Sequence, residues 1–133
     1  MENKITIGHL AKQANVNVET IRYYQRLNIV EKPPKPTEGF RLYPQSLIGI
    51  IKFIKRAQKL TFTLAEIKKI LQLGNRDCNK IKYLAKSKRD AVQVKIEELI
   101  AARDELDCLI DACEASEHTT SCALILSLTE NNI

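Results

Sequence analysis

The chain has 133 residues, of which 28% are charged, and a formal net charge of +5. Its length suits one ordinary domain with an extension. The sequence has no long apolar run and no signal-peptide core, which argues against a membrane-spanning or secreted protein. We therefore expect a cytoplasmic chain with reduced cysteines and no membrane partner. Residues 1–75 hold 13 Lys and Arg against 5 Asp and Glu, whereas residues 76–133 hold 8 against 11, which indicates that the first part meets a polyanion.

Residues 6–28 predict two short helices joined by a tight turn. Thr6 and Asn17 are placed to cap the two helices, and Asn28 can adopt the left-handed conformation that ends the second. An exposed, basic second helix is typical of a helix-turn-helix that reads DNA. Its outward face carries side chains suited to phosphate oxygens and base edges, namely Thr20, Arg22, Tyr23 and Arg26. The alternative is a helical hairpin with a merely solvated face.

The next segment, residues 31–46, is rich in proline, which excludes a helix across it. Its "TEG" offers a turn and its "FRLY" alternates as a short strand does, so we predict a β-hairpin, or wing. Arg41 and Tyr43 would then project near the same surface as the second helix. Pro44 is placed to open the following helix at its first position.

Two further helices are predicted from apolar residues at helical spacing. The first helix buries one face through Leu47, Ile50, Ile51, Ile54 and Ala57. Thr63 and Glu66 form a capping-box pattern at the start of the second helix, which would bury Ile67, Ile70 and Leu71. We interpret these apolar residues as core.

The ordered segments "TIGHLAKQANVNVETIRYYQRLNIVE", "GFRLY" and "LTFTLAEIKKIL" resemble the winged-helix DNA-binding region of MerR-type transcriptional regulators over about the first 75 residues. The resemblance implies DNA contacts at Arg22, Tyr23 and Arg41. Members of that family usually carry Gly where this chain has Asn28 and Thr61. Because Thr adopts the left-handed conformation poorly, we expect a local difference at the end of the third helix.

A long helix is predicted from about residue 80 to residue 113, where the chain has neither Gly nor Pro. Apolar or small residues recur there every seven positions at Ala85, Val92, Leu99, Leu106 and Cys113, and the positions four after the first four are Arg89, Ile96, Arg103 and Ile110. This is a heptad seam, so we expect the helix to pair with a second copy of the chain. The two seam arginines weaken it, which leaves the alternative that part of the stripe packs on the basic domain.

Three thiols mark the acidic half: Cys78, Cys113 and Cys122. If residues 78–113 are helical, 35 residues at about 1.5 Å each separate Cys78 from Cys113 by roughly 50 Å. A shared metal would therefore need Cys113 from a partner whose helix runs antiparallel. Cys122 can return to the same place across the polar loop of residues 114–121. Three thiolates suit a soft metal ion; the alternative is two incidental buried thiols.

The mercury-responsive branch of MerR proteins is similar in having three cysteines in this order with the same separations of 35 and nine. The resemblance implies a homodimer that holds Hg(II) through Cys78 of one chain and Cys113 and Cys122 of the other. Lead- and cadmium-responsive relatives use similar cysteines, so Pb(II), Cd(II) and Zn(II) stay open. We interpret His118 as a solvated loop residue rather than a fourth ligand, and Cys108 as a surface or packing thiol.

The predicted fold is mostly α: a winged helix-turn-helix DNA-binding domain over residues 1–75, a linker and long antiparallel coiled-coil dimerisation helix over 76–113, and a metal-binding loop with a short C-terminal helix over 114–133. By the resemblance, the dimer binds a double-stranded DNA operator and represses without metal. With metal bound, it activates RNA polymerase at the promoter by distorting the DNA.

Two other functions are compatible with the same residues. A thiol redox regulator would form a disulfide between Cys113 and Cys122 on oxidation, and a metal scavenger or carrier would bind metal without binding an operator. The sequence has no recognisable Ser/His/Asp or Cys/His constellation and no Gly-rich phosphate loop, so we do not expect an enzyme.

Overall fold

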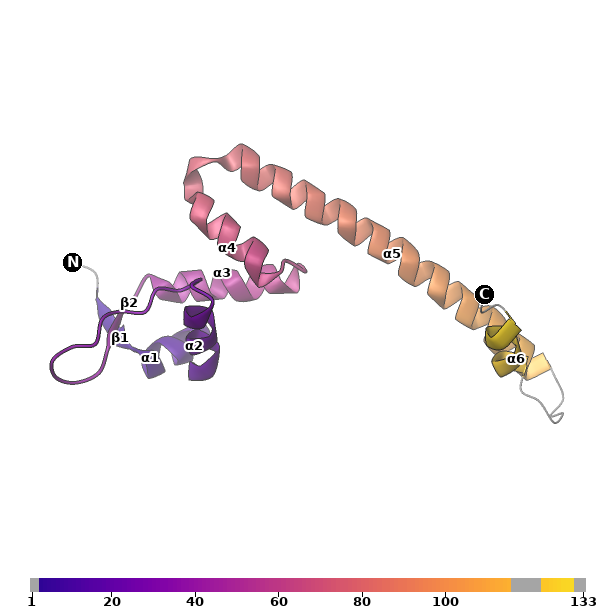
Figure 1. Cartoon of the computed structure of the whole chain (residues 1–133), viewed down its shortest axis with the longest axis horizontal. Helices are drawn as coiled ribbons and strands as arrows, with labels where there is room; N and C mark the ends of the chain where they lie inside the picture. The colour runs from indigo at the N-terminus through magenta and orange to yellow at the C-terminus, as the bar shows by residue number, and fades with distance from the viewer. Residues whose placement is uncertain (1–2, 116–122, 131–133) are drawn as a thin grey trace. The chain divides into compact units, whose positions relative to one another are not determined.

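The computed structural model describes residues 3–115 and 123–130 of the chain (Figure 1). The chain divides into two compact units, residues 1–85 and 86–133. Cys122 and His118 lie outside the described residues. In chain order the elements are β1 (Lys4–Thr6), α1 (Ile7–Ala14), α2 (Val18–Arg26), β2 (Leu42–Pro44), α3 (Leu47–Lys59), α4 (Leu64–Leu73), the 3₁₀ helix η1 (Gly74–Arg76), α5 (Cys78–Ala115) and α6 (Ala123–Glu130).

The helix-turn-helix of α1 and α2 forms with the caps that the sequence predicts. The His9 N–H donates to Thr6 Oγ1 at 3.3 Å, and the Thr20 N–H donates to Asn17 Oδ1 at 2.8 Å. Asn28 has a φ of 59°, so it ends the second helix in the left-handed conformation as expected. Each cap satisfies a backbone donor that the first turn of a helix leaves without a partner.

The core of the first unit lies where α1 packs against α2 and α3. Burial of each large aliphatic side chain contributes about 1.5–3 kcal/mol, so this cluster fixes how the helices pack. Residues of α1 to α4 supply it, including Ile51, Ile54, Ala57 and Ile67 at the spacing that the sequence predicts, and they are joined by one residue after α2 and one from β2. Its buried members are Leu10, Ala11, Ala14, Ile21, Tyr24, Val30, Tyr43, Ile51, Ile54, Ala57 and Ile67.

The predicted hairpin within residues 31–46 is wrong, because the strand β2 pairs with the N-terminal strand β1. The pairing is antiparallel, with Ile5 opposite Tyr43. The prolines of residues 33–36 lack the N–H groups that a strand donates, so the segment just before the turn cannot supply a ladder. The N-terminal strand, which the sequence reading missed, supplies it instead.

The start of α3 also differs from the prediction. Pro44 belongs to β2, and the next N–H, that of Gln45, donates to Asn3 O at 2.9 Å. This bond extends the strand pairing past Pro44, so the chain is still extended there and α3 begins only at Leu47.

The junction between α3 and α4 combines a left-handed residue with a capping box. Thr61 has a φ of 72°, and its N–H donates to Gln58 O at 3.0 Å. The Thr63 N–H donates to Glu66 Oε1 at 2.8 Å, and the Glu66 N–H donates to Thr63 Oγ1 at 3.2 Å. The predicted capping box is therefore confirmed. Thr61 adopts the left-handed conformation although it is β-branched, so the local difference expected at the end of the third helix is not observed.

The long helix α5 begins at Cys78 and ends at Ala115, two residues beyond the predicted range at either end. Asp77 stands just before it, and Asp77 Oδ1 accepts a hydrogen bond from the Lys80 N–H at 3.1 Å. This cap explains why the helix starts at the first cysteine. None of the described helices has an apolar stretch long enough to cross a lipid bilayer.

Candidate functional site

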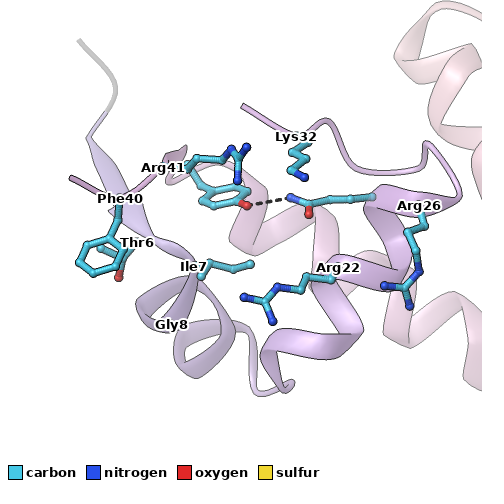
Figure 2. Close-up of a pocket in the computed structure, with 10 residues that line it drawn as sticks. Thr6, Ile7, Gly8, Arg22, Arg26, Lys32, Phe40 and Arg41 are labelled. Carbon is cyan, nitrogen blue, oxygen red and sulfur yellow. Dashed lines mark hydrogen bonds between the residues drawn. The ribbon is translucent and has the colours of Figure 1, made fainter. Parts of the chain in front are cut away.

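An open groove of about 780 Å³ lies in the first unit, beside the helix-turn-helix (Figure 2). Four cationic side chains line it, and among the described residues no carboxylate does, so the groove is suited to a polyanion. Its walls come from the start of α1, from α2 and from residues 32–43. The lining residues are Thr6, Ile7, Gly8, Arg22, Gln25, Arg26, Lys32, Phe40, Arg41 and Tyr43.

The helix α2 contributes two of the cations, Arg22 and Arg26, which lie one turn apart. Arg22 Nη1 lies 2.8 Å from Glu19 Oε1, and both side chains are more than half exposed. An exposed pair of this kind contributes only about 0–1 kcal/mol, so the guanidinium can exchange Glu19 for a phosphate at little cost. The Arg26 guanidinium lies 5.7 Å from the centroid of the Tyr23 ring, which holds it beside the groove.

The segment after α2 contributes the other two cations, Lys32 and Arg41. Arg41 is half-buried, and its Nε atom is buried without a hydrogen-bond partner among the described residues. Sequence reasoning selected Arg41 and missed both Lys32 and Gln25. Spacing could have found Gln25, because it lies three residues after Arg22 and therefore on the same face of the helix. No local sequence pattern identifies Lys32, because it lies at the groove only as a result of how the segment after α2 folds back.

The remaining predicted DNA-contacting residues fall in different surroundings. Tyr23 is 44% exposed and, with Thr20 and Arg26, lines a shallower depression that also includes Lys55 of α3. The Thr20 hydroxyl donates to Asn17 Oδ1 at 2.7 Å, so it already takes part in the helix cap.

Tyr43 requires a correction, because its side chain is only 3% exposed and belongs to the core. Its position on β2, opposite Ile5, places it in the core, although Tyr43 is also among the residues that line the groove, and its hydroxyl accepts a hydrogen bond from Gln25 Nε2. The Tyr43 ring therefore does not project from the surface as predicted, whereas a DNA contact through its hydroxyl stays a prediction.

A second buried tyrosine joins α2 to α3. Tyr24 is 2% exposed, and its hydroxyl donates to Gln58 Oε1 at 3.1 Å. Burial raises the pKa of Tyr24 above its ordinary value because the charged phenolate would lose its hydration. The hydroxyl therefore stays protonated and keeps donating at neutral pH.

The thiols lie at the two ends of α5. Cys78 is its first residue and Cys113 lies two residues before its end, and both are exposed. Cys108 is exposed too, in agreement with its interpretation as a surface thiol. Over residues 3–115 and 123–130 no three His, Cys, Asp or Glu side chains come together as a metal site would require.

A capped helix-turn-helix beside a cationic groove defines the class of DNA-binding transcription regulators. Two family models agree with this class: "MerR HTH family regulatory protein" matches residues 5–73, and "MerR, DNA binding" matches residues 49–109. The chain belongs to the MerR family of helix-turn-helix regulators.

Among curated relatives, the chain is 41% identical to the mercuric resistance operon regulatory protein of Shigella flexneri, over 96% of this chain and 92% of that protein. Among solved structures, PbrR691 from Ralstonia metallidurans CH34 in complex with lead(II) is 30% identical, with a TM-score of 0.80 over 93% of this chain and 98% of that one. MerR from Bacillus megaterium MB1 in complex with mercury(II) is 35% identical, with a TM-score of 0.73 over 94% and 99%.

Proposed function

We propose that this chain is a metal-responsive transcription regulator that binds a double-stranded operator as a homodimer and takes Hg(II) as its effector. The supporting relatives are the mercuric resistance regulator at 41% identity and the regulator solved with mercury(II) at 35%. The proposed ligands are Cys78 of one protomer and Cys113 and Cys122 of its partner.

The observation that carries the proposal is the continuity of α5. Cys78 and Cys113 belong to one helix of 38 residues, and 35 residues of α-helix extend about 50 Å. Bonds from sulfur to a thiophilic metal are only about 2.3 Å long, as for zinc. One ion therefore cannot reach both thiols of the same helix, whereas two antiparallel copies of α5 would bring Cys78 of one beside Cys113 of the other.

The second half of α5 supports pairing with a second copy. Its heptad positions Ile96, Leu99, Leu106 and Ile110 are 42–68% exposed in the single chain. Leaving such a stripe in water forgoes about 1.5–3 kcal/mol for each large side chain. A symmetric partner presenting the same stripe would cover it. The two seam arginines meet acidic neighbours on their own helix, Arg89 with Asp90 and Arg103 with Asp104.

The chemistry of the donors selects soft metals without selecting one of them. Thiolates favour thiophilic ions over Mg²⁺ or Ca²⁺, and the two metal-bound relatives were solved with different ions. Pb(II) is therefore the second candidate, because the lead(II) complex aligns over 93% of this chain. Cd(II) and Zn(II) follow on the same donor chemistry.

In the proposed mechanism, metal binding at the ends of α5 is coupled to the DNA-binding units. Without metal, the dimer holds the operator and represses. The ion would bind where the two chains meet, and a small shift there would turn both DNA-binding units, distort the DNA and realign the promoter for RNA polymerase. The ion can drive this change only by binding the activating arrangement more tightly than the repressing one.

A footprinting and transcription experiment on a mercury-resistance promoter tests the proposal, with Hg(II), Pb(II), Cd(II) and Zn(II) added separately. The wild-type dimer should protect the operator with and without metal, and Hg(II) should induce transcription at the lowest concentration. Cys78→Ser, Cys113→Ser and Cys122→Ser should each abolish induction and preserve the footprint, whereas Cys108→Ser should change neither. Induction by oxidant without metal would favour the thiol redox alternative, and metal binding without a footprint would favour a scavenger.

A further inference from the structure

Gln25 is the uncharged polar side chain that α2 places in the cationic groove, together with Arg22 and Arg26. It is half-buried, and its Nε2 donates to the Tyr43 hydroxyl at 2.8 Å, a bond drawn as a dashed line in Figure 2. An amide adds little to the attraction for phosphates, which the four cations already supply. Its place in the groove therefore calls for a role other than charge.

Tyr43 is a fixed partner for this amide. Tyr43 is 3% exposed and belongs to the core, and its Cα pairs with that of Ile5 across the two strands. Because the Tyr43 side chain is packed in the core, it has little freedom to move toward Gln25. The hydrogen bond therefore orients the Gln25 amide, and Gln25 does not orient Tyr43. The same bond also ties α2 to the strand that follows Arg41, so it joins the two walls of the groove.

The bond to Tyr43 uses only part of the hydrogen-bonding capacity of the amide. A glutamine side chain has one oxygen acceptor and two N–H donors. With one N–H directed to Tyr43, the oxygen and the second N–H remain as an adjacent acceptor and donor. This pair complements the N6 amino group and N7 of adenine in the major groove.

We propose that Gln25 reads an A·T base pair in each half of the operator and that Tyr43 is the positioning residue that orients it. The inference rests on the proposed DNA binding and deepens it. Arg22, Arg26, Lys32 and Arg41 then supply mainly affinity for the backbone, whereas the oriented amide supplies sequence information.

The test is selection of random-sequence duplexes by the full-length protein, followed by affinities for every single-base-pair variant of the selected site. The wild-type protein should prefer A·T over the other pairs at one position of each half-site by about 5- to 150-fold. Gln25→Glu should move that preference to a pair with cytosine, because a carboxylate accepts from the cytosine N4 amino group. Preferences at the other positions should stay as they are.

Tyr43→Phe should flatten the same preference several-fold while leaving the salt dependence of binding unchanged, because no charge is removed. Tyr24→Phe is the matched control. It also removes the hydroxyl of a buried tyrosine bonded to a glutamine, but Tyr24 does not line the groove, so the base preferences should not change. A purely structural role for Tyr43 would weaken all positions alike.

The inference is overturned if no A·T position responds to Gln25→Glu, or if Tyr43→Phe and Tyr24→Phe give the same base preferences. Either result would leave the DNA-binding proposal standing, because the wild-type protein would still select a site. A wild-type protein that enriches no sequence would overturn the proposed function and this inference together.

Discussion

Among the described residues, Thr61 is the one β-branched residue with a positive φ. Its φ of 72° lies in the left-handed region, which a β-branched residue adopts at a cost of about 1–2 kcal/mol. The turn between α3 and α4 nevertheless keeps this conformation, because hydrogen bonds on either side fix it: Thr61 N–H to Gln58 O and Phe62 N–H to Ala57 O. The strain is thus tolerated by the surrounding helix end.

Thr61→Gly should therefore stabilise the protein. Relief of the strain exceeds the backbone entropy that Gly loses on folding, so we expect a gain of about 0.5–1 kcal/mol in the free energy of unfolding. Urea unfolding at fixed protein concentration measures it. Thr61→Ala keeps a Cβ at the same φ and should bring little of that gain. A lower urea midpoint for the glycine variant would contradict this explanation.

From the raised pKa of Tyr24, we predict that the free energy of unfolding falls at alkaline pH. Its folded-state pKa is raised by burial, so its contribution is fully present below the unfolded value of 10.0 and is lost as the pH rises through the folded pKa. Tyr24→Phe cannot ionise, and should lose less stability than the wild type above about pH 10. At neutral pH the variant should be weaker by about 1 kcal/mol for the lost bond to Gln58. Parallel slopes of stability against pH for the two proteins would refute the assignment.

At the scale of the element, α5 is exposed on more than one face in the single chain, so exposure alone does not identify the surface of the proposed dimer. Leu99 is 68% exposed and Val94 is 52% exposed. The heptad separates them, since Leu99 occupies the seam and Val94 lies on the opposite side of the helix.

This difference makes Leu99→Lys and Val94→Lys a matched pair. Leu99→Lys puts a charge into the seam of both protomers, and the dimer should dissociate at least about 100-fold more readily. Val94→Lys should leave the dissociation constant within a few-fold of the wild type. Sedimentation equilibrium measures both, and an equal effect of the two substitutions would exclude the heptad seam as the interface.

At the scale of the whole molecule, the proposed metal site predicts complementation between damaged chains. A chain with Cys78→Ser and a chain with Cys113→Ser each lack one ligand in every site of their own homodimer. Mixed together, they form a dimer in which one site has all three thiols intact.

The mixed dimer should therefore bind one Hg(II) tightly, whereas both parent homodimers should bind it weakly. Differently tagged chains allow the mixed dimer to be purified and its bound mercury to be counted. A mixed dimer that binds no more mercury than its parents would rule out ligands shared between protomers.

The local patterns of the sequence determined most of the elements of this protein. Capping residues and apolar spacing predicted α1, α2 and α4 and the capping box at Thr63, because these features depend on neighbours within one helical turn. The same locality predicted that Arg22 and Arg26 lie on the outward face of the second helix, and both line the groove. The absence of Gly and Pro predicted α5 to within two residues at each end.

Only the tertiary structure decided which distant segments meet. Residues 18 or more positions apart are joined by the pairing of β2 with β1 and by the bond from Gln25 to Tyr43. The burial of Tyr43 depends on the same long-range contacts. No pattern within a short window carries that information, because strand partners are chosen by packing against a shared core. For the same reason the sequence placed Tyr43 on the surface, whereas the fold buries it in the core with its hydroxyl bonded to Gln25.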